Sequence, residues 1–210
     1  MTQYLSSILA ILLLSACAGN PIQEYSTYLT APAEGEPLTA SDAIHQVPGT
    51  KLAKGERAKF EIDLNDPQIN LDGVRSFYQV FQVNGSANSS VAIKTFSHMK
   101  TGPAGGLGPI YVVWPRVYIL DESGNVLSDK PESGEVGRAA LGLGPLQYEA
   151  TWKATMPASG ACNVLVTSDN RVLGEHVARE DATLTAGGVF VPWTYGLRAH
   201  STGAMSIEWR

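Results

Sequence analysis

Apolar and polar residues alternate one by one along residues 148–156. Every second position is apolar and the positions between are polar or charged, the apolar ones being Tyr148, Ala150, Trp152, Ala154 and Met156. Successive side chains of a β-strand point to opposite faces of a sheet. The pattern therefore predicts a strand with one face in the core and one in solvent. It places Trp152 in the core, and the alternation of Trp209 with Ile207 does the same for Trp209.

Similar runs recur along the chain and are separated by residues typical of turns. We expect further strands near residues 60–64, 77–83, 91–96, 110–114, 116–120, 126–127, 163–167, 186–192 and 205–209. The first three of these are expected to pair as a meander. Many short strands joined by Gly and Pro turns are typical of a sandwich. The predicted fold class is all-β, a single jelly-roll-like β-sandwich over residues 46–210.

Helical signals are few in the folded domain. One helix is predicted over residues 171–179, behind the capping residues Ser168, Asp169 and Asn170. A shorter helical turn is expected over residues 39–45, with Ser41 or Asp42 as its cap. Residues 98–109 and 128–146 are rich in Gly and Pro and are expected to be loops. Pro115, between two apolar runs, predicts a bulge, a bend or a sheet edge.

The N-terminus carries a different pattern, a short apolar run over residues 4–16. It is shorter than the 20 or so residues that span a bilayer, and it ends in small residues, as secretory signal peptides do. Residues 14–17, Leu-Ser-Ala-Cys, resemble the bacterial lipobox, which predicts a signal peptide over residues 1–16 and a lipidated Cys17. An ordinary signal peptide and an uncleaved anchor are the alternatives.

The predicted lipid on Cys17 makes membrane lipid the first expected partner. Two or more acyl chains hold a protein stably on a bilayer. Residues 17–45 contain Pro-rich stretches and little periodicity, so we expect a tether there. Ala18 follows the cysteine, and in the lipoproteins that this motif resembles, a residue other than Asp at this position directs the molecule to the outer membrane. The expected location is the outer membrane, facing the periplasm, and display on the cell surface is the alternative.

Charge and cysteine content narrow the function. The 210 residues carry a net charge of −5, and nucleic acid is bound mainly through clustered Lys and Arg, so no nucleic-acid partner is expected. With Cys17 acylated, Cys162 is the only other cysteine, and no intramolecular disulfide forms. Cys162 has no His or Lys neighbour in sequence and is expected to be a buried structural thiol. Without lipidation, a bridge between Cys17 and Cys162 is the competing arrangement.

No catalytic motif stands out. The chain has neither a Gly-x-Ser-x-Gly elbow nor a phosphate-binding Gly-rich loop. Its four histidines are isolated in sequence, so a metal site would need them to meet in space. Residues 121–125 space their side-chain oxygens like a calcium loop but lack the later Glu, and a hairpin turn explains them. We therefore expect no enzyme activity, no metal and no cofactor.

Tryptophan offers the best recognition chemistry in the sequence. Aromatic faces with polar groups nearby bind sugars and peptides by apolar contact. Trp114 precedes Pro115 and Trp193 follows Pro192, so both are expected at strand ends where a ring can be exposed. Trp114 and Trp193 are the candidate ligand-binding residues.

Three segments of the second half carry a family resemblance. Residues 117–121 with the following turn, residues 162–167, and residues 197–203 before a last strand agree in order and spacing with the maltose operon periplasmic protein (MalM) family. The likeness covers residues 45–210 loosely. The resemblance implies a sandwich-like periplasmic protein associated with carbohydrate uptake, with no assigned catalytic residues.

These observations lead to one main hypothesis and two alternatives. The main hypothesis is a non-enzymatic, periplasm-facing lipoprotein whose sandwich binds a partner, in maltose or maltodextrin transport as the resemblance implies. The first alternative is a structural subunit of a cell-envelope assembly that pairs through exposed sheet edges. The second is a metal-assisted hydrolase built on the histidines.

Overall fold

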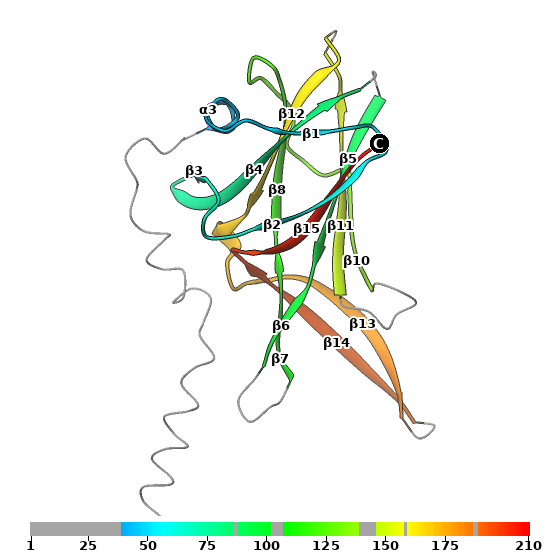
Figure 1. Cartoon of the computed structure of the whole chain (residues 1–210). Helices are drawn as coiled ribbons and strands as arrows, with labels where there is room; N and C mark the ends of the chain where they lie inside the picture. Colours follow the sequence, from blue (N-terminus) through cyan, green and yellow to red (C-terminus); the bar gives the residue numbers. More distant parts are fainter. Residues whose placement is uncertain (1–38, 86–87, 102–106, 139–145, 158, 187–188) are drawn as a thin grey trace, which may run out of the picture.

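The structure is a computed structural model that describes residues 39–85, 88–101, 107–138, 146–157, 159–186 and 189–210. Its strands form three sheets, and two of these pack face to face around the main core (Figure 1). The prediction of an all-β sandwich is confirmed. The predicted signal peptide, Cys17 and most of the predicted tether lie outside the described residues.

Sheet 1 and sheet 2 are the two layers of the sandwich. Sheet 1 has the order β1 (Thr50–Leu52), β4 (Val74–Asn84), β12 (Ala161–Ser168), β8 (Pro115–Asp121) and β9 (Val126–Ser128), with β3 (Gln68–Leu71) on β4. Sheet 2 has the order β10 (Ser133–Arg138), β11 (Leu146–Thr155), β5 (Asn88–Phe96), β15 (Gly203–Trp209) and β2 (Arg57–Ile62). Among the described strands of these two sheets, only β1 and β4 pair in parallel.

The main core lies between these sheets, and the alternating sequence builds it. The apolar positions of β11 are buried and its polar positions are half-buried or exposed, as the pattern predicted. Trp152 is 2% exposed and Trp209 is fully buried, so both predictions for these rings are confirmed. The Trp209 Nε1 donates to the backbone carbonyl of Asn84, 2.9 Å away. This bond joins the last strand of the chain to sheet 1.

The outer face of sheet 1 is covered by α3 (Ala40–Gln46) and β3. Ala40, Ala43 and Ile44 of the helix are buried against apolar residues of β4, β8 and β12. The expected helical turn therefore exists, but its cap is Thr39, whose Oγ1 accepts a hydrogen bond from the Asp42 backbone N–H at 3.1 Å. Because the helix packs on the sheet, the folded domain begins before residue 46, the boundary that we predicted.

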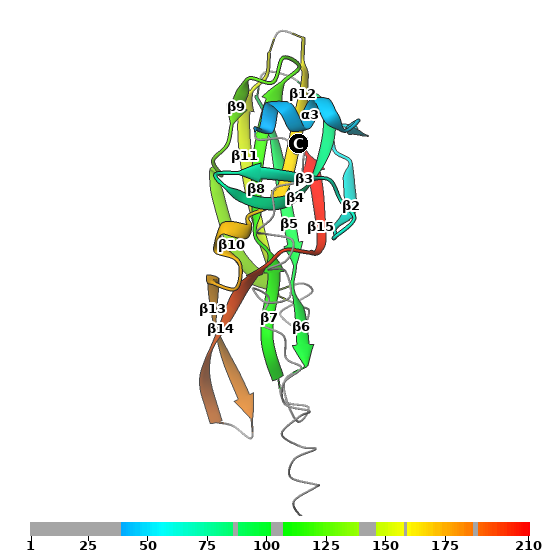
Figure 2. The same ribbon diagram turned by 90° about the vertical axis from the view of Figure 1, so that its left-hand side faces the viewer.

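Sheet 3 lies below the sandwich in Figures 1 and 2. Its order is β13 (His176–Ala186), β14 (Val189–His200), β7 (Leu107–Val113) and β6 (His98–Thr101). Three of these strands continue strands of the sandwich with only one or two residues between: β5 leads into β6, β7 into β8, and β14 into β15. We call the crossing residues Ser97, Trp114, Ser201 and Thr202 the waist. The predicted break at Pro115 is confirmed, since β8 starts there in a different sheet.

The predicted meander is wrong. β2 and β5 belong to sheet 2, where β15 lies between them, whereas β4 lies in sheet 1 between β1 and β12. All three strands bury apolar residues in the same core, but they approach it from opposite layers. Alternation identifies a buried face and contains no information on which strand lies alongside.

The predicted helix over residues 171–179 is also wrong. A single 3-10 turn, η3 (Asn170–Val172), follows the predicted cap Asp169, and β13 begins at His176. Gly174 has φ +77°, which a helix does not tolerate in its interior. Its N–H donates to the Ala199 carbonyl at 2.9 Å, and the Ala199 N–H donates to the Glu175 carbonyl at 3.0 Å. Pairing with the end of β14 replaces the helical bonds.

Several strands lie where we expected loops or a single strand. β6 and the start of β7 fall within residues 98–109, and β10 falls within residues 128–146. The strand expected over 186–192 spans the end of β13 and the start of β14, which pair as a hairpin. Glycine-rich composition obscured these strands, because glycine contributes no side chain to an alternating pattern.

Candidate functional site

A cavity of about 350 Å³ opens on the outer face of sheet 2 at the waist. We call it the waist cavity, and its lining residues are Glu61, Phe96, Ser97, His98, Thr202, Gly203 and Ala204. Glu61 and Ala204 are direct partners in the β2–β15 ladder. Phe96 shares the parity of Lys94 and is half-buried, so its ring lies on the face away from the main core. The cavity forms because β5 and β15 both leave sheet 2 at this point.

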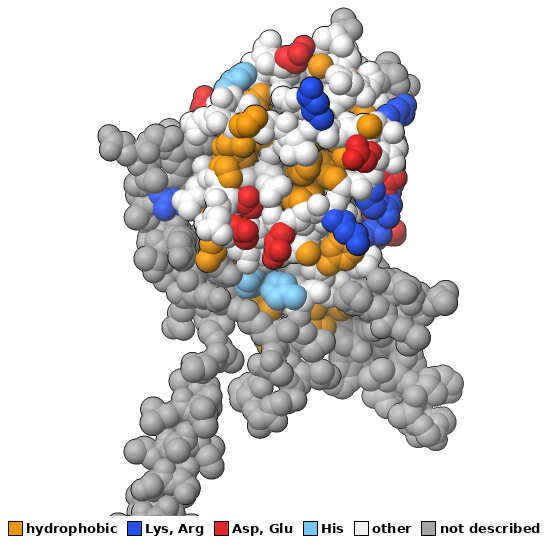
Figure 3. Space-filling view, viewed as in Figure 1, with side chains coloured by type: hydrophobic (Ala, Val, Ile, Leu, Met, Phe, Trp, Pro, Cys, Tyr) orange, Lys and Arg blue, Asp and Glu red, His pale blue; other side chains and the backbone are white. Residues whose placement is uncertain are grey.

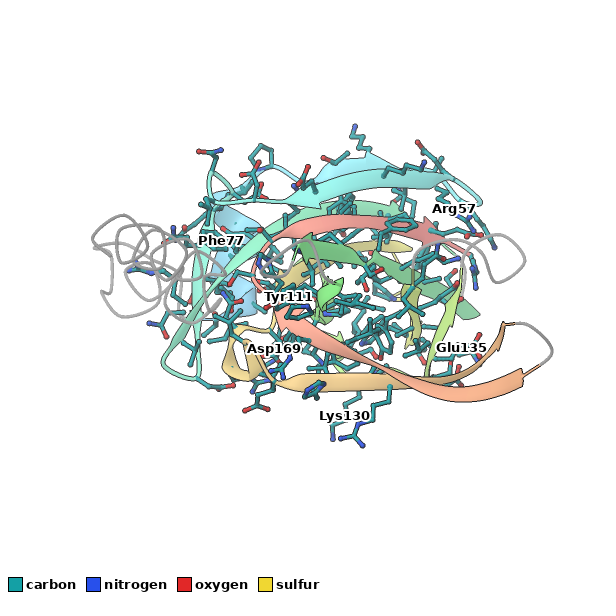
Figure 4. All side chains as sticks on the ribbon, turned by 90° about the horizontal axis from the view of Figure 1, so that it is seen from below. Arg57, Phe77, Tyr111, Lys130, Glu135 and Asp169 are labelled. Atoms are coloured by element: carbon teal, nitrogen blue, oxygen red, sulfur yellow. The ribbon has the colours of Figure 1, made fainter. Side chains whose placement is uncertain are left out.

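Three rings pack behind the waist cavity. The His98 and His200 rings are 4.7 Å apart at an angle of 84°, and Tyr111 lies 5.9 Å from His98 and 5.3 Å from His200. Nδ1 of His200 is 3.0 Å from the Thr202 carbonyl oxygen. Figure 4 shows Tyr111 from below, near the middle of the molecule. In Figure 3 one group of histidine atoms lies at the lower border of the described surface, with acidic side chains above it, and another histidine lies at the upper left.

The waist cavity combines an apolar platform with hydrogen-bonding groups. Phe96 and His98 supply ring surface, Ser97 and Thr202 supply hydroxyls, and Glu61 supplies a carboxylate. Among the described residues the Glu61 carboxylate has no hydrogen-bond or ion-pair partner. Ligand sites typically pair a ring surface with a few convergent polar groups. Its chemistry suits a small ligand with both a flat apolar face and hydroxyl groups.

A second cavity, of about 410 Å³, opens on the outer face of sheet 1. We call it the amide groove, and its lining residues are Ile44, His45, Lys51, Gln82, Val83, Asn84, Glu122, Ala161, Cys162 and Asn163. It begins where the cover formed by α3 ends. On this face β4 changes from the buried Tyr78 and Val80 to the exposed Gln82 and Asn84. On β12, Asn163 lies two positions before the buried Leu165 and therefore on the same face of the strand.

The two tryptophans that we predicted as ligand-binding residues lie in different parts of the fold. Trp114 is half-buried at the waist, packs against the main core and the lower cluster around Val112 and Leu197, and its ring lies 4.2 Å from the Tyr148 ring. Trp193 pairs with Ala182 in the β13–β14 hairpin, and its side chain lies outside the described residues. Ligand contact by either ring stays a prediction, as does lipidation of Cys17.

Cys162 and the turn at residues 121–125, which the sequence also singled out, have structural roles in the fold. Cys162 is 2% exposed, and burial followed by the nearby carboxylates of Asp121 and Glu122 raises the pKa of its thiol to about 11. The structural thiol is confirmed. Asp121 accepts from the backbone N–H groups of Ser123 and Asn125, both at 2.9 Å, which is the predicted turn chemistry. Within the described ranges no three His, Cys, Asp or Glu side chains are grouped to hold a metal.

Sequence reasoning missed both cavities. The amide groove has a signal in the sequence. On β4 and β12, amide side chains occupy positions that lie on the same face of the strand as buried apolar residues. The waist cavity has a weaker one, the Phe96-Ser97-His98 and His200-Ser201-Thr202 segments at the ends of apolar runs. The sequence of these two segments does not show that they lie next to each other in the fold.

Comparison with family models, with curated proteins and with solved structures found no match for this chain. The resemblance to the MalM family therefore stays a prediction based on the three segments. None of the helices in the described part of the chain has the length and apolar composition that crossing a bilayer requires.

Proposed function

We propose that this chain is a non-enzymatic lipoprotein of the bacterial cell envelope whose sandwich binds a saccharide in the waist cavity. Lipid on Cys17 anchors it to the outer membrane on the periplasmic side. The MalM resemblance makes maltose or maltodextrin the first ligands to test, in carbohydrate transport. The observation that carries the proposal is the meeting of Phe96, Glu61 and two hydroxyl side chains around one cavity.

The chemistry of a sugar ring matches these groups. One face of a pyranose is lined with C–H groups and packs on an aromatic ring, while its hydroxyls exchange hydrogen bonds at the rim. A carboxylate accepts from two such hydroxyls, and Ser and Thr hydroxyls both donate and accept. The cavity volume lies within the usual range for small-molecule sites. Phe96 is the platform, Glu61 the acceptor, and Ser97 and Thr202 complete the rim.

The tether is predicted from the sequence, and its residues lie outside the described structure, which begins at Thr39. A flexible chain of the length between Cys17 and Thr39 would have a root-mean-square reach of about 26 Å, from 5–6 Å times the square root of its length. With such a tether we expect the anchored sandwich to stand clear of the lipid headgroups.

Isothermal titration of the purified protein with maltose, maltotriose and non-glucose saccharides tests the ligand. We expect binding of at least one saccharide. Phe96→Leu, which keeps apolar bulk and removes the aromatic face, and Glu61→Gln each weaken binding about tenfold, the loss of one stacking contact or one charge-assisted hydrogen bond. Glu135→Gln, at an exposed position of β10, is the matched control and leaves binding unchanged. A flat titration across the panel contradicts the proposal.

Metabolic labelling with palmitate tests the anchor. The full chain, expressed in a bacterial host, is expected to carry the label and to sediment with outer-membrane vesicles. Cys17→Ser removes the acceptor thiol and abolishes both. Label retained on Cys17→Ser refutes the lipoprotein assignment, whatever the outcome of the titration.

A structural subunit of an envelope assembly is the second proposed function, and the edge of sheet 3 favours it. β13 is 11 residues long, and among the described strands it pairs only with β14. An open edge of this length is a template for pairing with another chain. A stoichiometric envelope protein that co-purifies from detergent extracts and is lost when proline replaces Ala178 supports this function. Purification of the chain alone contradicts it.

A further inference from the structure

We propose that the amide groove is a second binding site, and that its ligand is a small zwitterion with peptide-like groups, a free amino acid or a dipeptide. This site goes beyond the proposed saccharide function and does not depend on it. The groove and the waist cavity lie on the outer faces of different sheets, so occupancy of one leaves the other open.

Two opposite charges flank the amide groove. The strand order places β1, β4, β12 and β8 side by side, so that Lys51 on β1 pairs with Gln82, and Gln82 pairs with Asn163. Glu122 follows the last residue of β8, two positions beyond Leu120, which is the partner of Asn163. Neighbouring strands lie about 4.8 Å apart and the rise along a strand is about 3.3 Å per residue, so three spacings and this offset place the Lys51 and Glu122 backbones about 16 Å from each other. Both side chains line the groove, and they shorten the gap to the length of a dipeptide or less.

Amide side chains fill the floor between these charges. Gln82, Asn84 and Asn163 each offer a donor and an acceptor, which is the pattern that a peptide group needs. Among the described residues the side chains of Lys51, Gln82, Asn163 and Glu122 have no hydrogen-bond or ion-pair partner. A Cβ on Gly49 would lie 2.7 Å from Cγ of Gln82, so the segment before β1 holds the Gln82 stem closely.

Glu122 is the carboxylate that can bind a ligand ammonium, because the neighbouring carboxylate is already hydrogen-bonded. The neighbouring Asp121 carboxylate accepts from backbone N–H groups and from the side chain of Asn125 at 2.8 Å. These bonds hold the Asp121 pKa below its usual value. On the other flank Lys51 is the cation for a ligand carboxylate, and His45 of α3 borders the groove as a third titratable group. Balanced charge and amides favour a zwitterion over an ion of one sign.

Titration of the full chain with alanyl-alanine, followed by calorimetry or by amide chemical shifts, tests the proposal. We expect binding that weakens about tenfold on N-acetylation of the dipeptide, and about tenfold on C-terminal amidation, since each removes one charge-assisted hydrogen bond. In Glu122→Gln the effect of N-acetylation disappears, and in Lys51→Met the effect of amidation disappears. These paired losses assign each end of the ligand to one residue.

Lys54→Met, at an exposed position in the turn before β2, is the matched control and leaves both effects intact. Phe96→Leu also leaves dipeptide binding unchanged, which separates this site from the waist cavity. Absence of dipeptide binding overturns the proposal, and so does binding that both charge variants leave unaltered. Saccharide binding that Gln82→Leu and Asn163→Leu abolish overturns the zwitterion and assigns the groove to a neutral ligand.

Discussion

The Cys162 thiol lies in the main core with its Sγ 3.5 Å from the Met156 sulfur. Its pKa of about 11 leaves about one molecule in a thousand as thiolate at pH 8, and the thiolate is the reactive form. In the Cys17→Ser variant, where Cys162 is the only cysteine, we expect a disulfide reagent to react at least a hundredfold more slowly than with free cysteine at pH 8. Unfolding in guanidinium restores the rate. Fast reaction in the folded protein contradicts the burial.

Glu208 supports a pH-dependent part of the stability. Hydrogen bonds from Arg210 and then from Arg57 lower its pKa from 4.5 to about 2. Because the folded pKa lies below the unfolded one, this stabilisation is present above pH 4.5 and is lost as the pH falls from 4.5 to 2. Glu208→Gln is expected to lose about 1 kcal/mol at pH 7.

Thermal unfolding of the Glu208→Gln variant between pH 7 and pH 2 gives the comparison. The difference from the parent protein closes below pH 4.5. Glu135→Gln removes the same charge from an exposed position on β10 and is expected to show a smaller difference at pH 7 and little change with pH. A Glu208→Gln gap that stays constant down to pH 2 contradicts the ion-pair account.

Single residues differ in how much their sequence context predicts. Trp152 and Trp209 stand at apolar positions of clear alternation, and both rings are buried. Phe96 has no such context, because β5 ends there and its parity places it outside the core. The cavity that it lines also needs Glu61 of β2 and Thr202, between β14 and β15, and both are far away in the sequence. Local pattern decides burial, whereas a cavity is decided by which strand ends meet.

Among the elements, the segment after β12 gives the sharpest test of the fold. Gly174 has φ +77°, and a residue with a Cβ costs about 1–2 kcal/mol in that conformation. Gly174→Ala is therefore expected to lower the free energy of unfolding. If residues 171–179 formed the helix that their sequence favours, the same change would raise it by about 1 kcal/mol.

Urea unfolding measures the sign of this effect. Gly174→Asn is the companion variant, because Asn tolerates the left-handed conformation better than Ala, and we expect it to lose less stability than Gly174→Ala. Stabilisation by Gly174→Ala contradicts the turn.

The alternating pattern predicts where a strand lies more readily than it predicts which strands pair with it. Alternation over residues 60–64 and 148–156 predicted β2 and β11, and the whole buried face of β11 is as predicted. β2 spans Arg57–Ile62 instead, and Leu64, which the pattern placed on the buried face, lies beyond its end and is 39% exposed. The partners of β2, β4 and β5 depend on long-range packing, since each strand meets neighbours from distant parts of the chain. The β13–β14 hairpin shows the limit, because the single strand predicted over 186–192 covers the end of β13 and the start of β14.

At the scale of the whole molecule, three strand pairs change sheets at the waist, and this crossing forms one of the two cavities described above. The waist cavity forms where β5 and β15 leave sheet 2. The amide groove forms at the other end of the sandwich, where the cover of sheet 1 ends. The fold class was predictable from sequence, because alternation and turns recur throughout. The two cavities were not, because the waist cavity depends on the crossing and the amide groove on where the cover formed by α3 ends.

The most direct test of the proposed function is chemical-shift mapping of the ¹⁵N-labelled protein with maltotriose. We predict that the shifts which change on titration cluster at Phe96, Ser97, His98 and Thr202, that they saturate together, and that Phe96→Leu weakens the apparent affinity about tenfold, the loss of one ring contact. Spectra that stay unchanged at millimolar maltotriose, or changes confined to residues away from the waist cavity, would contradict the account.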